Sequence, residues 1–233
     1  MVTNPSLRTM LDSGVHFGHK TSRWNPKMAP YIFTSKSKVH VINLEKTAEK
    51  LMEATNFIAR MAKENKKFIF VGTKKQSSEL IKKAAIECGA SYVNVRWIGG
   101  TLTNMEVLKS SVNKFKKQTE LLASDKIDLN KKELAKLKKE HARGEKIFGG
   151  LTGLNSKADV LILFGSYDEK IALAEAKVEG VPVIALVDTN ADPTKIDYPI
   201  PANDDATKSI ELFANLFAKV IKENKLVAQA QTK

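Results

Sequence analysis

The residues best suited to chemistry lie in one short stretch near the N-terminus, residues 14–28. The stretch has no acidic residue and holds three cations, two aromatic rings and two glycines: Lys20, Arg23, Lys27, Phe17, Trp24, Gly14 and Gly18. Lysine and arginine bind phosphates, aromatic rings stack on unpaired bases, and glycine permits a close approach of the backbone. This inventory favours RNA binding over catalysis. The alternative, equally open on residue types alone, is that Trp24 and Phe17 anchor an N-terminal arm on an apolar surface.

Two histidines in the same stretch raise the question of a metal site. His16 and His19 have the spacing i, i+3, but no cysteine is nearby and no acidic ligand falls between Gly14 and Met28. We expect both rings to be hydrogen-bonded or to face solvent. The sequence therefore predicts no metal site in this stretch.

A second candidate site is Gly72-Thr73-Lys74-Lys75, which follows the apolar run 68–71. The chain has neither the G-x-x-x-x-G-K-[ST] of a P-loop nor a G-x-G-x-x-G after its first strand, so a bound nucleotide cofactor is not expected. Lys74 and Lys75 begin a predicted helix and suit a nonspecific phosphate contact. Gly99-Gly100, which follows Arg96-Trp97, is typical of a tight turn whether or not Arg96 touches RNA.

Four aspartates form the most enzyme-like group: Asp188, Asp192, Asp204 and Asp205. Carboxylates in neighbouring loops can hold an oxygen-preferring ion, so a structural magnesium or zinc ion near Asp188 and Asp205 is the less favoured alternative. Helix caps and turns are favoured, because Asp204 or Asp205 precedes an apolar helix, and Asn190, Asp192 and Pro193 have turn chemistry. No Ser-His-Asp or Cys-His arrangement is evident, and we predict neither enzymatic activity nor a cofactor.

The composition indicates an anionic partner. The 233 residues carry 38 Lys and Arg against 26 Asp and Glu, which gives a net charge of +12 and a pI near 9.6. A surface of this charge suits a polyanion such as nucleic acid. No apolar run reaches the length of a membrane span, and the N-terminus has no signal-type apolar core, so we expect no membrane insertion or export. The single cysteine, Cys88, excludes an internal disulfide and fits the cytoplasm or an organelle matrix.

Short apolar runs alternate with amphipathic stretches along most of the chain. The predicted strands are 39–42, 68–71, 160–164 and 183–187, with a last short strand ending at Ile200, and the predicted helices are 45–64, 76–88, 168–179 and 205–223. This alternation predicts a doubly wound α/β fold, in which a parallel sheet is covered by helices on both faces. The tail from Ala228 has no apolar periodicity and is expected to be flexible.

An insertion interrupts this alternation between Thr103 and Gly150. Its seam positions recur at heptad spacing in two series: Met105, Leu108, Val112, Phe115, Thr119 and Leu122, then Ile127, Asn130, Leu134, Leu137, His141, Gly144 and Phe148. The pattern predicts an antiparallel coiled-coil hairpin with a polar turn at 124–130 and a capping pair of Asn130 with Glu133. Residues 109–146 hold twelve Lys or Arg against six Asp or Glu. A solvated face is the usual explanation for lysine-rich helices, but this excess favours an anionic partner.

Six segments of the chain, taken in order, point to a family. They are VHFGHKTSRWNPKMAPYIF from residue 15, INLEKT at 42–47, FVGTKK at 70–75, RWIGGTLTN at 96–104, VDTNADP from 187 and IPANDDA at 200–206. From about Leu7 to Lys222 the chain resembles the bacterial-type small-subunit ribosomal protein family two. The chain departs from the family pattern at Val95, where histidine is common, and at Gly165, where aspartate is common.

The resemblance implies a flavodoxin-like strand order and a structural role on the solvent side of the small subunit, near the junction of head and body. It implies contacts with small-subunit rRNA and with neighbouring ribosomal proteins, including ribosomal protein one where the organism has it. No membrane and no small-molecule substrate are implied. Two other functions remain open on the residues alone: a phosphosugar or nucleotide-dependent enzyme that uses 72–75 and Asp188, and a free RNA-binding regulator.

These expectations divide the chain into four parts. They are an rRNA-contacting arm (1–35), a discontinuous α/β domain (36–102 and 151–224), a basic coiled-coil hairpin (103–150) and a flexible tail (225–233). The predicted RNA-binding residues are Lys20, Arg23, Trp24, Lys27, Lys36, Lys38, Lys74, Lys75, Arg96, Lys114, Lys117, Lys132, Lys136 and Lys139.

Overall fold

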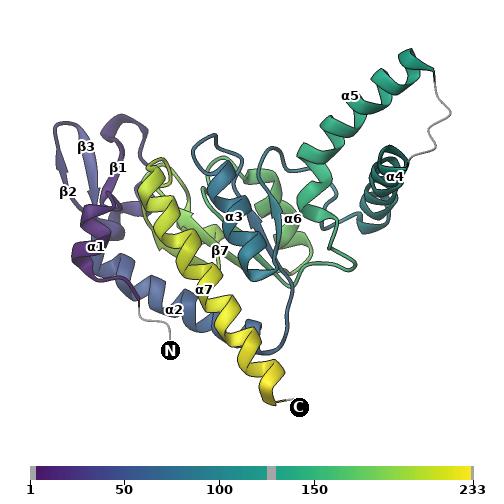
Figure 1. Cartoon of the computed structure of the whole chain (residues 1–233). Helices are drawn as coiled ribbons and strands as arrows, with labels where there is room; N and C mark the ends of the chain where they lie inside the picture. The colour runs from purple at the N-terminus through teal and green to yellow at the C-terminus, as the bar shows by residue number, and fades with distance from the viewer. Residues whose placement is uncertain (1–3, 125–129, 232–233) are drawn as a thin grey trace.

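A five-stranded parallel sheet lies at the centre of the structure, a computed structural model that describes residues 4–124 and 130–231 (Figure 1). Its strands are β4 (Phe68–Val71), β5 (Ser91–Val93), β6 (Val160–Leu163), β7 (Val183–Val187) and β8 (Tyr198–Pro201). They lie in the order β5-β4-β6-β7-β8, and all neighbours are parallel. Counted within this sheet the order is 2-1-3-4-5, that of flavodoxin-like folds. The predicted doubly wound α/β fold is confirmed.

Helices cover both faces of this sheet, which explains why its central strands are apolar at every position. On one face, α2 (Leu44–Lys63), α3 (Ser78–Cys88) and α7 (Thr207–Gln231) enclose a cluster that includes Phe70 and Ile162. On the other face, α6 (Lys170–Val178) and the first half of α4 (Met105–Ala123) enclose a second cluster that includes Val71 and Leu163. Adjacent residues of one strand thus enter different cores.

The run Val39–Ile42 was predicted as a strand of the parallel sheet, and this prediction is wrong. It forms β3 of a separate antiparallel sheet, in the order β1-β3-β2, with β1 (Phe17–Lys20) and β2 (Ile32–Lys36). Strands β2 and β3 form a hairpin, because Ser37 and Lys38 both have positive φ and close a two-residue turn. Neither residue gives the usual Asn-Gly signal. The predicted boundary at residue 35 therefore falls inside β2.

The remaining short elements connect the arm and the loops to these sheets. Helix α1 (Leu7–Asp12) packs against α2 and begins with a Ser6 cap, whose side chain accepts from the Thr9 amide. The described residues also form four 3₁₀ turns: η1 (Thr21–Arg23), η2 (Pro26–Tyr31), η3 (Gly149–Leu151) and η4 (Pro193–Lys195). No helix within the described ranges is long and apolar enough to cross a membrane.

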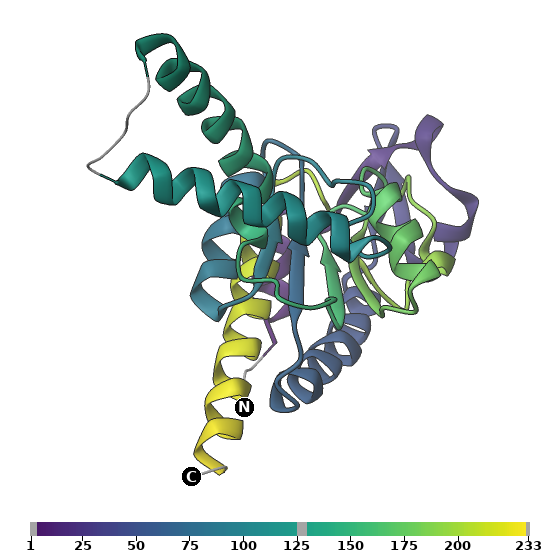
Figure 2. The ribbon, with the colours of Figure 1, turned by 90° about the vertical axis from the view of Figure 1, so that its right-hand side faces the viewer.

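The insertion forms two helices, α4 and α5 (Lys131–Phe148), that project from the body and diverge toward their far ends (Figure 2). They meet at the base, where Phe115 stacks on His141 at 5.0 Å between centroids. A Cβ at Gly144 would lie 2.8 Å from the Phe115 ring, so only glycine allows this approach. The two helices therefore pack against each other only near the body. The predicted antiparallel coiled coil is not confirmed along their whole length. Ile127 and positions 125–129 of the predicted turn lie outside the described residues.

Two further predictions about element ends have different outcomes. The capping box of α5 is confirmed, because Asn130 Oδ1 accepts from the Glu133 amide and Glu133 Oε2 accepts from the Asn130 amide. In the described part of the predicted tail, residues 225–231, the chain is helical, because α7 continues to Gln231. Its last residues, KLVAQAQ, are mostly good helix formers that need no apolar periodicity to extend an existing helix.

The base of α4 belongs to the α/β body and not to a separate hairpin. Leu108 and Val112 are buried, each 6% exposed, in the same cluster as Val71 of the sheet. Phe115 is the last buried residue of α4. The predicted boundary at 103 is therefore too early, and the exposed projection begins beyond Phe115.

Candidate functional site

The N-terminal arm presents aromatic rings that are both packed and exposed. Trp24 is 39% exposed, and its ring lies against that of His40 with 5.1 Å between centroids. Phe17 is 53% exposed and contacts His16 in the same way. The two alternatives for Trp24 are therefore compatible: the ring is anchored on one side and remains open to a stacking partner on another.

Four of the predicted RNA-binding cations lie on the surface of this arm and of the β2–β3 turn that follows it. Lys20, Arg23, Lys36 and Lys38 are exposed, and no ion pair joins them to any described residue. Phe33 of β2, which was not among the predicted site residues, is 73% exposed beside them in the sequence. Strand alternation could have predicted this exposure. Successive side chains of a strand point to opposite faces, and the neighbouring Ile32 packs against the second core cluster, so Phe33 faces solvent.

Lys27 anchors the arm and is not a free cation. Its Nζ lies 2.8 Å from Oδ2 of Asp192 and donates to Oγ1 of Thr194 at 3.2 Å. Hydrogen bonds from Lys27 and Thr194 lower the pKa of Asp192 to about 2. Asp192 also caps η4 by accepting from the Thr194 amide, as the turn prediction required. Lys27 thus has an internal role, and its predicted contact with a phosphate stays a prediction.

Lys74 is likewise held inside the molecule. Its Nζ lies 2.6 Å from Asp204 Oδ1, 2.7 Å from Asp205 Oδ1 and 3.2 Å from Asp168 Oδ2. The Asp204 side chain is fully buried, so the ammonium group is its counterion. Only Lys75 of the predicted pair is exposed and available for a phosphate. Asp204 and Asp205 are about 130 positions away from Lys74 in the chain, so local patterns could not reveal these ion pairs, and the phosphate contact of Lys74 stays a prediction.

Neither Asp204 nor Asp205 serves as the predicted helix cap. Asn203 instead forms the turn that leads into α7, since its Oδ1 accepts from the backbone amides of Asp205 and Ala206, which precede the first helical residue, Thr207. Burial is the largest influence on Asp204 and raises its pKa to about 7, against the opposing effect of Lys74. One oxygen of Asp204, Oδ2, is buried without a hydrogen-bond partner among the described residues. This carboxyl group is thus in an unusual environment for an aspartate.

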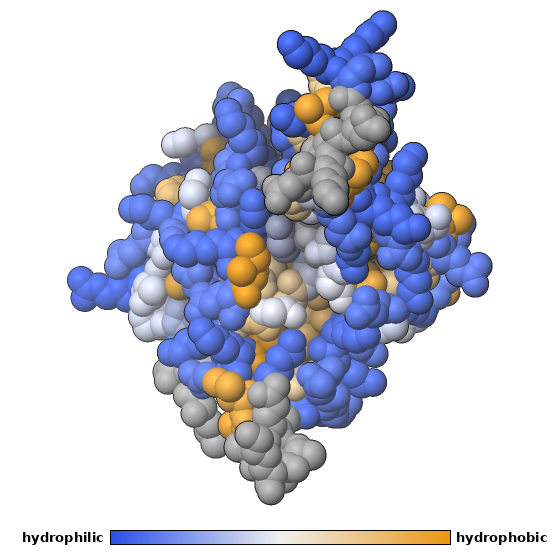
Figure 3. All heavy atoms as spheres, turned by 45° about the vertical axis from the view of Figure 1, so that its right-hand side comes forward, coloured by the Kyte–Doolittle hydropathy of each residue, from blue (hydrophilic) through white to orange (hydrophobic). Residues whose placement is uncertain are grey.

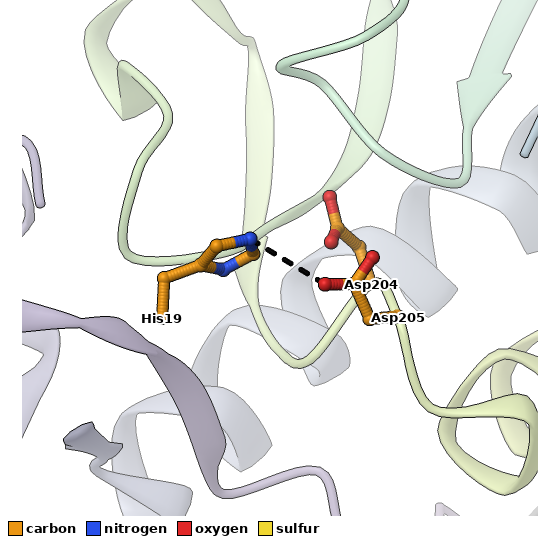
Figure 4. Close-up of side chains that lie close together, drawn as sticks. All are labelled: His19, Asp204 and Asp205. Atoms are coloured by element: carbon orange, nitrogen blue, oxygen red, sulfur yellow. Dashed lines mark ion pairs between the residues drawn. The ribbon is translucent and has the colours of Figure 1, made fainter. Parts of the chain in front are cut away.

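His19 connects the arm to the same carboxylates (Figure 4). Its Nδ1 lies 3.1 Å from Asp188 Oδ1, and its Nε2 lies 3.4 Å from Asp205 Oδ2. The hydrogen bond to Asp188 raises the pKa of His19 above its usual value. The His19 amide also donates to Oγ1 of Thr189 at 2.8 Å, so β1 is fixed to the loop after β7. Nothing in the local sequence signals this contact.

The ligand atoms of His19, Asp204 and Asp205 lie within 4.8 Å of one another, a spacing that suits a divalent ion. The donor set fits a metal only in part. Lys74 Nζ already contacts oxygens of both Asp204 and Asp205, and supplies the positive charge that an ion would bring. The structural ion near Asp188 and Asp205 therefore remains an alternative in competition with this lysine.

The turn after β5 is held by a buried glutamate that sequence reasoning missed. Glu175 of α6 accepts from Trp97 Nε1 at 3.0 Å and from the Gly100 and Leu102 amides at 2.8 and 2.9 Å. These donors lower the pKa of Glu175, although burial alone would raise it. The turn predicted at Gly99-Gly100 is present, and Arg96 is exposed beside it.

The projecting helices carry cations without described acidic partners. The five predicted residues are exposed, and no ion pair joins them to any residue in the described ranges: Lys114, Lys117, Lys132, Lys136 and Lys139. Hydrophilic side chains cover much of the projection on the face in Figure 3. A cationic surface without internal counterions is free to bind an external anion.

Comparison with known proteins gives this arrangement its context. A family model described as Ribosomal protein S2 matches residues 10–224. The chain belongs to the ribosomal protein S2 family. A relative in Thermosynechococcus vestitus, "Small ribosomal subunit protein uS2", is 45% identical over 221 residues, which cover 94% of this chain and 84% of the relative.

Membership of the ribosomal protein S2 family confirms the resemblance found in the sequence and decides between the classes of function. Proteins of this family have a structural role in the small ribosomal subunit and are not enzymes. The rival enzyme centred on residues 72–75 and Asp188 is thereby excluded. In the structure Lys74 is a counterion and Asp188 is a partner of His19, which agrees with that conclusion.

Proposed function

We propose that the chain binds small-subunit rRNA through two cationic surfaces and fixes their separation with its α/β body. The first surface is the arm together with the β2–β3 turn that follows it, with Lys20, Arg23, Trp24, Lys36 and Lys38. The second is the projecting hairpin, with Lys114, Lys117, Lys132, Lys136 and Lys139. Lys75 and Arg96 are further exposed cations on the α/β body, and in the sequence they lie between the two surfaces. Binding of this kind is led by phosphate contacts, since lysine and arginine displace counterions from the RNA backbone.

The observation that carries the proposal is the division of the cations into two groups. Lys27 and Lys74 form ion pairs with carboxylates of the same chain and hold the arm and loops together. The five hairpin cations have no ion pair within the described residues. A body fixed by the first group can present the second in a constant geometry. Such rigidity is what a protein that positions RNA elements requires.

The hairpin supports a further part of the proposal. Leu122, Leu134 and Leu137 retain heptad spacing beyond the contact at Phe115 and His141, and each is half-buried. We infer that these seam residues close into an antiparallel coiled coil when the projection lies along RNA. The α/β body is proposed to contact neighbouring ribosomal proteins, including ribosomal protein one where the organism has it. The expected place of action is the cytoplasm or an organelle matrix, within the small subunit.

Two measurements test the proposal. Affinity of the full chain for small-subunit rRNA should fall steeply with salt, by roughly 0.7 to 0.9 log units per log unit of salt for each phosphate neutralised. A salt slope near zero would contradict phosphate-led binding. Co-sedimentation of the native protein with small subunits separates a ribosomal constituent from a free RNA-binding regulator, which would remain in the soluble fraction.

A further inference from the structure

Besides the exposed cations, the body has a crevice of about 500 Å³ at the carboxyl ends of β6 and β7. One wall is a face of α6 with Lys170, Leu173, Ala174 and Lys177, whose spacing is that of one helix side. The loop from Asn190 to Lys195 forms the opposite wall. The carboxyl ends of parallel strands are where doubly wound folds bind ligands, although this crevice lies one strand away from the point between β4 and β6 where the strand order reverses.

Two residues that line this crevice each hold a buried polar atom without a hydrogen-bond partner among the described residues. They are Oγ of Ser166, a residue only 5% exposed, and Oδ1 of Asn190. Buried hydroxyl and amide groups are almost always hydrogen-bonded, so this pair indicates a ligand that supplies donors or acceptors. A hydroxyl group can donate and accept, and an amide oxygen accepts, so the two groups together can recognise the polar edge of a base.

The charges around these atoms favour an anion. Lys170 and Lys177 form no ion pair with any described residue, and Lys195 lies 3.9 Å from Asp192. Asp192 is the one acidic group that lines the crevice, and Lys27 already neutralises it at 2.8 Å. Lysines at the rim of an otherwise neutral crevice suit phosphates that stay near solvent.

The floor and the edge of the crevice favour a flat apolar ring. Leu173 and Ala191 are buried beneath it, and Tyr167, 45% exposed, stands at its border with the Lys170 ammonium 4.0 Å from the centre of the ring. Tyr167 and Asn190 also line a neighbouring crevice of about 490 Å³, whose wall includes Arg23 of the arm together with Asp168 and Asp205. A chain molecule held by the arm can therefore continue into the first crevice.

We propose that this crevice binds one unpaired nucleotide of an RNA strand, with the base over Leu173 and Ala174 and its edge at Ser166 and Asn190. Phosphates on either side of that nucleotide contact Lys170, Lys177 and Lys195. A phosphate alone would use the lysines but would leave the apolar floor and the Asn190 oxygen without a partner. The inference rests on the proposed RNA-binding function and names one place where a base, and not only the backbone, is contacted.

The test uses the full chain, a short single-stranded RNA oligonucleotide, an abasic oligonucleotide of the same length, and inorganic phosphate. Ala174→Phe should fill the crevice and weaken binding of the oligonucleotide about tenfold, the order expected for loss of one base stack. Ile86→Phe, at a 62% exposed position of α3, is the matched control and should leave binding unchanged. Ser166→Ala should weaken binding as well while the melting temperature stays equal or rises, because an unpartnered hydroxyl is removed.

The possible results distinguish failure of the crevice inference from failure of the proposed function. Equal affinity for the normal and the abasic oligonucleotide, or full displacement by inorganic phosphate, overturns the base site, because it leaves only a cationic patch. Loss of oligonucleotide binding in the Ile86→Phe control also overturns it. If Ala174→Phe is silent while affinity for whole rRNA keeps its steep salt dependence, the crevice inference falls and the proposed function stands. If the oligonucleotide binds at the crevice but rRNA affinity lacks salt dependence, the proposed function falls.

Discussion

Lys74 Nζ lies 2.6 Å from Oδ1 of Asp204 and joins the segment after β4 to the loop that precedes α7. The carboxylate is fully buried and the lysine side chain is 16% exposed. Removing one member of a buried ion pair leaves an uncompensated charge, and this is far more costly than removing an exposed charge.

A pair of adjacent lysine variants tests this role. Lys74→Met should lower the free energy of unfolding by about 2 to 3 kcal/mol, moderated because Asp204 can take up a proton when its counterion is lost. Lys75→Met should change stability by no more than about 0.5 kcal/mol, since Lys75 is exposed and has no described partner. Urea unfolding monitored by circular dichroism measures both. Equal stability of the two variants would show that Lys74 is not a structural counterion.

Asp204 should also give the protein a specific dependence on pH. Its pKa is raised from 3.8 to about 7, so the folded state binds this proton more tightly than the unfolded chain does. The folded state is therefore favoured below pH 4, and this contribution is lost as pH rises from about 4 to about 7, at up to about 1.4 kcal/mol per pH unit. Asp204→Asn should reduce the decline in unfolding free energy over that range. An unchanged pH profile in the variant would assign the decline to another group.

The hairpin cations should contribute to RNA affinity and not to stability. Replacing Lys132, Lys136 and Lys139 by Gln should reduce the salt slope of rRNA binding by about 0.7 to 0.9 for each lysine that contacts a phosphate. The melting temperature should stay constant, because no ion pair of these lysines is described. The control replaces three exposed lysines of the body, Lys83, Lys208 and Lys219, and removes the same charge. An equal loss of slope in the control would indicate nonspecific attraction.

The extent of the projection can be tested by deletion. A Gly-Ser linker in place of residues 103–150 should destabilise the α/β body, because it removes Leu108 and Val112 from the second core cluster. A linker in place of 120–140 should leave a cooperatively folded protein with weaker incorporation into small subunits. If the longer deletion unfolds with an unchanged midpoint, the core role of α4 is wrong.

The solvent-exposed face of the Trp24 ring should contribute to rRNA affinity. Trp24→Ala should weaken rRNA binding by about 1 to 3 kcal/mol if the ring stacks on a base, and Trp24→Phe should restore most of that loss. Both variants should be compared in small-subunit incorporation and in thermal unfolding. If Trp24→Ala lowers the melting temperature and leaves the affinity of the remaining folded protein intact, the ring serves only as the anchor against His40.

The sequence predicted those features that depend on local patterns. The apolar runs at 68–71 and 183–187 predict central strands, and Asn130 with Glu133 predicts the capping box, because the signal and the structure lie within a few residues. Val39–Ile42 has the same local pattern as a central strand, and only its hairpin partner distinguishes it. The contacts of His19 and Lys74 join residues more than 100 positions apart, and no periodicity reports such pairs. Cations that looked alike in the sequence therefore separated into structural and exposed ones only in the fold.

The turn between β2 and β3 has a consequence for how charge is distributed at the edge of the molecule. Ser37 and Lys38 have φ values of 51° and 62°, a conformation that glycine adopts without steric cost and that other residues adopt with strain of about 1 kcal/mol each. At the exposed Lys38, backbone strain thus favours glycine, whereas electrostatic attraction for a polyanion favours lysine. A glycine there would make the hairpin easier to form and at the same time deprive its outermost turn of a cation. Lys38→Gly would therefore stabilise the hairpin and weaken its attraction for a polyanion at the same time.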